Sequence, residues 1–178
     1  GAEPCDCPKK RYAARLTREL STILPIGDQN FEAFRLDYYS DVPDSRLGMS
    51  ARENMEYNLS VCRAYADTFS PQAKNLLLYG STGLGKTFLS SCIAGVVSRK
   101  GYSVAYDTAI RIFGSYESVK FTAPDAAEAA RRVRKYEQSD LLILDDLGTE
   151  MATSFTVSAF YGLLAARLMR RGPMIVST

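Results

Sequence analysis

One short stretch of the chain has the residue types and spacing of a phosphate-binding loop. Gly80 and Gly85, separated by four residues, are followed directly by Lys86 and Thr87. In such a loop the glycines let backbone N–H groups converge on a phosphate, the lysine supplies a cation, and the hydroxyl can ligate Mg²⁺. The pattern therefore predicts a site for ATP and Mg²⁺. The residues expected to contact the nucleotide are Gly80, Ser81, Thr82, Gly83, Leu84, Gly85, Lys86, Thr87 and Phe88.

A second motif supplies acidic groups. The apolar run 141–144 leads directly into Asp145 and Asp146. Enzymes with a phosphate-binding loop hold Mg²⁺ with an acid at the end of such a strand, so Thr87 and Asp145 are the predicted metal-binding pair. Lys86 and Asp146 are the predicted catalytic residues, Lys86 at the β- and γ-phosphates and Asp146 orienting or deprotonating the attacking water. Because aspartate is shorter than glutamate, we expect weak hydrolysis.

Strand-like and helix-like segments alternate along the second half of the chain. The expected strands are 75–79, 102–106, 141–145 and 174–178, and the expected helices are 86–99, 108–118, 124–138 and 154–170. This alternation predicts an α/β fold, a P-loop NTPase core with a parallel sheet flanked by helices. A strand before the loop and a helix after it are the context in which the loop pattern has physical meaning, which argues against a chance match.

The first part of the chain reads differently. We expect residues 1–48 to form a linker and connector and residues 49–178 to form the ATP-binding core. The connector contains an aromatic segment, 31–39, and two interpretations stay open: packing against the core, or lining the adenine pocket. Ser50 and Glu53 have the spacing of a capping box, which predicts a helix that runs toward Pro71.

Composition narrows the class of partner. The chain of 178 residues has 46% hydrophobic and 24% charged residues and a net charge of +2, which is typical of a soluble globular domain. Nucleic-acid binding would depend on local basic clusters, at 131–135 and 167–171. Solvated faces or cations placed at helix ends are the favoured interpretation of these clusters, and contact with a nucleic-acid backbone or with a neighbouring subunit's phosphate is the alternative. No apolar run approaches the roughly 20 residues that cross a bilayer, so we expect no membrane partner and a cytoplasmic location.

The chain has four cysteines and no histidine. Cys62 and Cys92 lie among apolar neighbours and are expected to be small buried residues. Cys5 and Cys7 could supply half of a zinc site, but tetrahedral zinc needs four ligands and no other candidates lie nearby, so no metal site is expected there within this chain. The abrupt start at Gly1 and the end at Thr178 lead us to expect part of a larger protein, truncated before the last strand and lid of the core.

The segments 75–87, 141–150 and 175–178 resemble the DnaC/DnaI/IstB-like group of AAA+ ATPases, and the resemblance extends over nearly the whole chain. It implies an ATP switch that self-assembles through ATP and helps to load a replicative helicase ring onto single-stranded DNA. In the IstB branch it implies a helper of a transposase. It also makes Cys5 and Cys7 similar to the trailing half of a zinc-binding N-terminal domain that contacts the helicase.

The resemblance also implies a DNA-facing element. Segment 108–121 occupies the place where related ATPases carry a helix that faces DNA, so Arg111, Lys120 and Phe121 are the candidates for backbone contact and base stacking. Two other classes stay open. One is a nucleotide-dependent interaction module with negligible hydrolysis; the other, a small-molecule kinase, is disfavoured because no acceptor-binding lid motif is visible.

Overall fold

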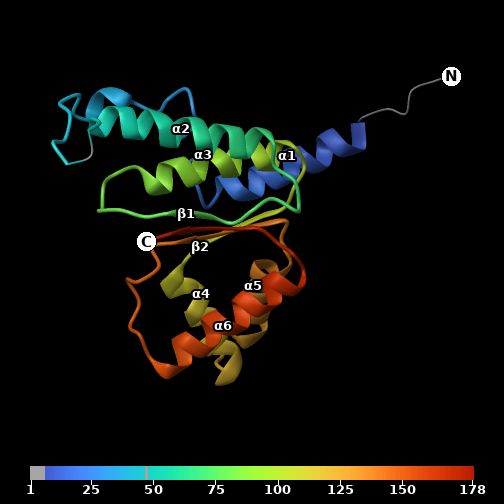
Figure 1. The fold of residues 1–178 in the computed structure, drawn as a ribbon. Coiled ribbons are helices and arrows are strands. Elements are labelled where there is room, and N and C mark those ends of the chain that lie inside the picture. Colours follow the sequence, from blue (N-terminus) through green and yellow to red (C-terminus); the bar gives the residue numbers. More distant parts are fainter. Residues whose placement is uncertain (1–6, 47) are drawn as a thin grey trace.

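Four parallel strands form the sheet, in the order β1-β4-β3-β2. A computed structural model describes residues 7–46 and 48–178, and its strands are β1 Leu76–Leu78, β2 Val104–Thr108, β3 Leu141–Asp145 and β4 Met174–Ser177 (Figure 1). Leu78 is in register with Ser177, and Thr108 with Asp145. Because all strands run the same way, their carboxyl ends lie together at one edge of the sheet, where open α/β sheets place their ligands.

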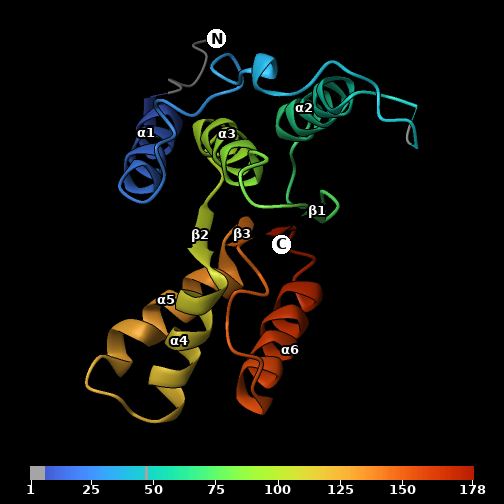
Figure 2. The same cartoon turned by 90° about the vertical axis from the view of Figure 1, so that its left-hand side faces the viewer.

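The helices cover both faces of the sheet. On one face lie α1 Cys7–Ser21, α2 Ala51–Asp67 and α3 Lys86–Arg99; on the other lie α4 Ala109–Lys120, α5 Ala126–Gln138 and α6 Ser154–Met169 (Figures 1 and 2). A 3₁₀ turn, η1, spans Leu36–Tyr38. The predicted fold class, a parallel sheet flanked by helices, is confirmed.

The central strand β3 explains why its sequence is a continuous apolar run. Leu141 and Ile143 belong to the hydrophobic cluster under α1, α2 and α3, whereas Leu142 and Leu144 belong to the cluster under α4, α5 and α6. All four side chains are fully buried. A parallel strand covered on both faces has no polar side, so it loses the alternation typical of a half-exposed strand.

The strand β2 begins later than the sequence predicts. The Asp140 carboxylate accepts hydrogen bonds from the backbone N–H and the hydroxyl of Ser103, each at 2.7 Å, so residue 103 is tied to the turn before β3. The ladder then starts with Val104 opposite Leu141. This shift puts Tyr106 at the centre of β2 and extends the strand to Asp107 and Thr108.

The N-terminal segment packs into the same core as the rest of the chain. Leu20, Leu24 and Phe31 share a hydrophobic cluster with Cys62 and Cys92. The capping box at the start of α2 is confirmed, since Ser50 and Glu53 exchange side-chain and backbone hydrogen bonds.

The two core cysteines are buried free thiols, as predicted. Burial raises the pKa of Cys62 to about 11 and that of Cys92 to about 12. Cys5 and the side chain of Cys7 lie outside the described residues. Across the described part of the chain, no three His, Cys, Asp or Glu side chains cluster in a way that could hold a metal ion. None of the helices described is long and apolar enough to cross a membrane.

Candidate nucleotide-binding site

The loop between β1 and α3 has the backbone of a phosphate cradle. Gly80, Gly83 and Gly85 have positive φ angles of 144°, 82° and 84°. A residue with a side chain would be strained at these backbone angles. The Lys86 ammonium donates hydrogen bonds to the carbonyls of Gly80 at 2.7 Å and Ser81 at 3.0 Å. The loop therefore folds around the Lys86 cation, and the N-terminus of α3 faces the same place.

The two predicted motifs meet at Thr87 and Asp145. The Thr87 hydroxyl donates a hydrogen bond of 2.9 Å to Oδ2 of Asp145, across 58 residues of sequence. Asp145 is 1% exposed and ends β3, which places its carboxylate at the loop edge of the sheet. A hydroxyl and a carboxylate are oxygen donors of the kind that Mg²⁺ prefers, so these residues fit a magnesium ion shared with phosphate oxygens.

Asp146 has an unusual backbone. Its φ is 55°, in the left-handed region that non-glycine residues rarely occupy, and its side chain is exposed. The backbone N–H of Asp146 donates a hydrogen bond of 2.9 Å to the Ser177 hydroxyl. The chain thus turns sharply after Asp145, so that the buried acid and the exposed acid are adjacent in sequence but differ in environment.

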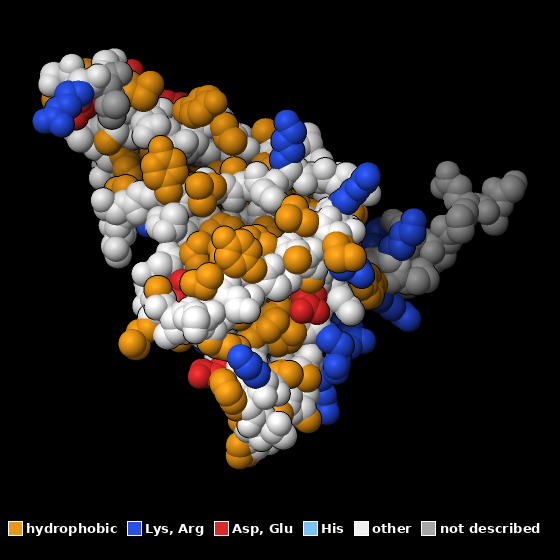
Figure 3. Space-filling view, turned by 60° about the horizontal axis from the view of Figure 1, so that its bottom comes forward, with side chains coloured by type: hydrophobic (Ala, Val, Ile, Leu, Met, Phe, Trp, Pro, Cys, Tyr) orange, Lys and Arg blue, Asp and Glu red, His pale blue; other side chains and the backbone are white. Residues whose placement is uncertain are grey.

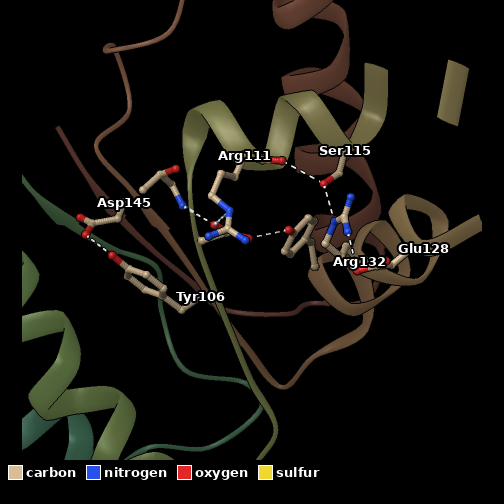
Figure 4. Close-up of polar contacts among 9 residues, drawn as sticks. Tyr106, Arg111, Ser115, Glu128, Arg132 and Asp145 are labelled. Carbon is tan, nitrogen blue, oxygen red and sulfur yellow. Dashed lines mark hydrogen bonds and ion pairs between the residues drawn. The ribbon is translucent and has the colours of Figure 1, made fainter. Parts of the chain in front are cut away.

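Two further residues contact the buried acid, and the sequence prediction missed both. The Tyr106 hydroxyl donates a hydrogen bond of 2.7 Å to Oδ2 of Asp145 (Figure 4), and the Ser177 hydroxyl donates one to Oδ1. Burial, reinforced by this hydrogen bond to Asp145, holds the pKa of Tyr106 well above its usual value. The signal that could have found them is their place near the carboxyl ends of the strands that flank β3.

The aromatic connector reaches the phosphate-binding loop. The Tyr39 hydroxyl donates a hydrogen bond of 3.2 Å to the Leu84 carbonyl, and the Phe34 ring stacks on that of Tyr39 at 6.0 Å. Phe88, a predicted nucleotide contact, lies with its ring edge-on to Phe34 at 5.4 Å. A Cβ on Gly85 would lie 3.0 Å from the Tyr39 hydroxyl. The connector therefore supports the loop from outside.

A hollow of about 270 Å³ lies beside the loop. Its walls come from α2, from β1, from the loop itself and from the first turn of α3. The lining residues are Asn54, Met55, Asn58, Leu77, Leu78, Tyr79, Leu84, Lys86 and Leu89. Because Lys86 belongs both to this wall and to the phosphate cradle, the hollow and the loop are neighbouring parts of one site.

The three candidates for DNA contact are not brought together. Arg111 lies in the first turn of the 12-residue helix α4, and its Nε is 3.1 Å from Oδ1 of Asp107 (Figure 4). Lys120 ends the helix, and its ammonium lies over the rings of Phe121 at 5.4 Å and Phe155 at 4.8 Å. A single DNA strand that contacts all three residues must therefore run along the length of α4.

One arginine of the last basic cluster is placed in the interior. Arg167 is 1% exposed, and its guanidinium donates hydrogen bonds to the carbonyls of Ser139 at 2.5 Å and Pro173 at 2.6 Å. Burial lowers its pKa to about 10. For Arg167 a solvated face and a nucleic-acid contact are therefore wrong, whereas its predicted place in the last turn of a helix is confirmed. Arg170 and Arg171 are exposed.

Comparison with known proteins places this geometry in a family. Residues 58–178 match the family described as IstB-like ATP binding protein. The chain belongs to that family. It is 25% identical over 175 residues to the replicative helicase loader DnaI of Bacillus subtilis, covering 97% of this chain and 53% of that protein. It is also 25% identical over 171 residues to an insertion-sequence ATP-binding protein of Mycobacterium tuberculosis, covering 95% of this chain and 60% of that protein.

Solved structures agree on the fold. The crystal structure of the DnaC helicase loader superposes with a TM-score of 0.66 at 18% identity, covering 86% of this chain and 78% of that one. AMPPCP-bound DnaA from Aquifex aeolicus gives a TM-score of 0.59 at 19% identity, covering 85% of this chain and 42% of that one. The resemblance to the DnaC/DnaI/IstB-like group is thus confirmed, and the chain spans about half the length of the curated relatives it matches.

Proposed function

We propose that the chain binds ATP with Mg²⁺ and hydrolyses it slowly. The observation that carries this proposal is the hydrogen bond between Thr87 and Asp145, which joins the phosphate cradle to the acid at the end of β3. Lys86 would exchange its loop carbonyls for β- and γ-phosphate oxygens, and Thr87 and Asp145 would hold the ion. Bound Mg²⁺ supplies charge neutralisation at the transferring phosphoryl group.

Asp146 is the proposed residue that orients or deprotonates the attacking water. Its exposed carboxylate follows Asp145, the proposed metal-binding residue, at a sharp turn of the chain. The Asp146→Asn variant keeps the shape and removes the base, so its turnover should fall by about 100-fold while nucleotide affinity stays unchanged. Steady-state ATP turnover measures this, and an unchanged rate would remove Asp146 from the mechanism.

We further propose that this ATPase helps to load a replicative helicase onto single-stranded DNA. Support comes from the similarity to DnaI over nearly the whole chain and from the shared fold with the DnaC helicase loader. In this proposal residues 1–48 connect the core to an N-terminal domain that contacts the helicase, with Cys5 and Cys7 as zinc ligands. ATP would join neighbouring copies of the core, and the protein would act in the cytoplasm.

The test uses the complete protein, including its N-terminal domain, and the replicative helicase of the same organism. Mass analysis of the mixture with ATP should find a stoichiometric complex that transfers helicase to circular single-stranded DNA. The Lys86→Ala variant should fail to transfer it. If no complex forms under any nucleotide condition, the loader function is wrong.

A second function is favoured by the family match and the insertion-sequence relatives. In that case the protein would be an ATP-dependent helper of a transposase. ATP-dependent capture of a transposase, with no capture of the helicase, would select this alternative. Tight ATP binding without measurable turnover would instead select a nucleotide-dependent interaction module.

For DNA contact we propose the exposed side of α4. Phe121 is 64% exposed, and hydrophobic side chains gather on the face formed by α4, α5 and α6 (Figure 3). Lys120 and Phe121 would contact a phosphate and a base, and Arg111 would share its guanidinium between Asp107 and the DNA backbone. Replacing Phe121 with alanine should weaken binding of a fluorescent oligothymidine about tenfold, since stacking contributes roughly 1–3 kcal/mol per base. Equal binding by wild type and variant would remove Phe121 from the contact.

A further inference from the structure

The Asp145 carboxylate is contacted by three hydroxyl groups from three different elements. Oδ2 accepts from Thr87 on α3 at 2.9 Å and from Tyr106 on β2 at 2.7 Å, and Oδ1 accepts from Ser177 on β4. The carboxylate is therefore held from both neighbouring strands and from the helix that follows the loop. A buried carboxylate with this many donors has one orientation.

Tyr106 reaches the acid because of strand register. Thr108 is the residue opposite Asp145, and Tyr106 lies two positions earlier on the same side of β2. Two residues of a strand span roughly 6.6 Å, a distance that the long phenol side chain can bridge and a serine or threonine cannot. Tyr106 is half-buried and packs against the hydrophobic cluster under α3, so its ring direction is fixed by packing. Figure 4 shows its hydroxyl directed at the Asp145 carboxylate.

The two donors to Oδ2 differ in whether a bound ligand would contact them. In the function proposed above, the Thr87 hydroxyl would offer a lone pair to Mg²⁺ and keep its O–H on Oδ2, so its position would depend on the ion. Tyr106 belongs to a strand and not to the loop, and its hydroxyl stays with Oδ2. It would then hold this oxygen in place independently of the loop and of the ion.

We propose that Tyr106 is a positioning residue that sets how Asp145 presents its carboxylate to Mg²⁺. This inference rests on the proposed ATP and Mg²⁺ site, and it adds a residue from β2 to it. Outer partners that orient a metal-binding carboxylate commonly affect metal affinity by 10–100-fold. If Tyr106 only satisfied the hydrogen-bonding needs of a buried acid, its loss would instead lower the stability of the fold equally with and without Mg²⁺.

The chain offers a matched control in Tyr116. It is also half-buried, and its hydroxyl donates to a carboxylate, that of Glu137, at 2.9 Å. Glu137 lies on α5, away from the phosphate-binding loop. Replacing Tyr116 with phenylalanine removes the same kind of hydrogen bond outside the site.

The experiment measures AMPPCP binding by calorimetry in EDTA and across a Mg²⁺ titration, for wild type, Tyr106→Phe and Tyr116→Phe. For Tyr106→Phe the Mg²⁺ concentration at half-maximal tight binding should rise about tenfold, with the affinity in EDTA unchanged. Tyr116→Phe should match wild type in both conditions. Mn²⁺ binding in the presence of AMPPCP, followed by electron paramagnetic resonance, should weaken in the same variant only.

An unchanged Mg²⁺ requirement in Tyr106→Phe, or an equal loss of affinity with and without Mg²⁺, would overturn the positioning role. If Tyr106→Phe does not fold at room temperature, the same titrations at reduced temperature give the comparison, and loss of the fold there as well would show a structural role only. If wild type itself shows no Mg²⁺-dependent binding of AMPPCP, the proposed function fails, and this role fails with it.

Discussion

The protein binds its cationic side chains differently at the carboxyl ends and at the amino ends of the strands. At the carboxyl ends of the strands, Lys86 donates to two carbonyls of an exposed loop, and Thr87 donates to Asp145 from the first turn of the helix that follows that loop. At the amino ends of the strands, Arg167 is wholly buried. It donates to the carbonyls of Ser139 and Pro173, which belong to turns that join helices to strands. Both cations are bonded to carbonyls, yet only the first set of partners can be replaced by a ligand.

The difference shows what separates a binding cation from a structural one. Residue type and backbone partners are similar, whereas exposure and the rigidity of the partners are not. A Cβ on Gly172 would lie 2.7 Å from the Arg167 guanidinium carbon, so the turn is packed directly against this side chain. Arg167 should therefore contribute to stability and Lys86 to ligand affinity.

The largest expected effect is that of replacing Arg167 with methionine. Two short hydrogen bonds to buried carbonyls are lost, so the free energy of unfolding should fall by about 4 kcal/mol. Chemical denaturation measures this, and the exposed neighbour Arg170→Met is the matched control, with a change within about 0.5 kcal/mol. Equal stability of the two variants would contradict the structural assignment.

The complementary change is Lys86→Met. Its carbonyl partners are exposed to water, so unfolding should change by less than about 0.5 kcal/mol. ATP affinity should fall about 100-fold, or about 2.7 kcal/mol, because the cation that faces the phosphates is lost. Calorimetric titration with ATP checks the affinity. If the Lys86→Met variant unfolds more easily but still binds ATP as tightly as wild type, Lys86 is a structural cation and not a binding one.

Gly85→Ala should have an intermediate effect. Its φ of 84° strains any side chain, and the new Cβ would press on Tyr39 and Phe34. We expect a loss of about 2 kcal/mol in stability together with weaker ATP binding. Gly27→Ala, where a Cβ meets nothing within 4 Å, serves as the control. Thermal melts of both variants with and without ATP give the answer, and a Gly85→Ala protein that melts like wild type would show that the loop adapts.

The smallest expected effect is that of Tyr39→Phe. The variant keeps the stacking on Phe34 and loses only the hydrogen bond to the Leu84 carbonyl, so ATP affinity should fall about threefold, or about 0.7 kcal/mol. Tyr38→Phe, at an 80% exposed ring, should leave affinity unchanged. Nucleotide titrations that do not distinguish the two variants would show that the connector does not support the loop.

The sequence predicted the parts of this site that are encoded locally. The glycine spacing gave the loop, and the apolar run before Asp145 gave the strand that carries the acid. Tyr106, Ser177 and the role of Arg167 depend on which strands are neighbours and on their register, and that information is not present in any single segment. The two-residue error at the start of β2 had the same origin, because the contact of Ser103 with Asp140 fixes where pairing begins.

The strand β1, which leads into the phosphate-binding loop, is short and pairs with one described neighbour. Within the part of the chain that the structure describes, β1 is three residues long and pairs with β4 alone, while Leu77 is 60% exposed. Among the described residues, the entry to the phosphate-binding loop is therefore held in place by β4, the same strand that supplies Ser177 to Asp145. The loop and the acid at the end of β3 thus share one supporting strand.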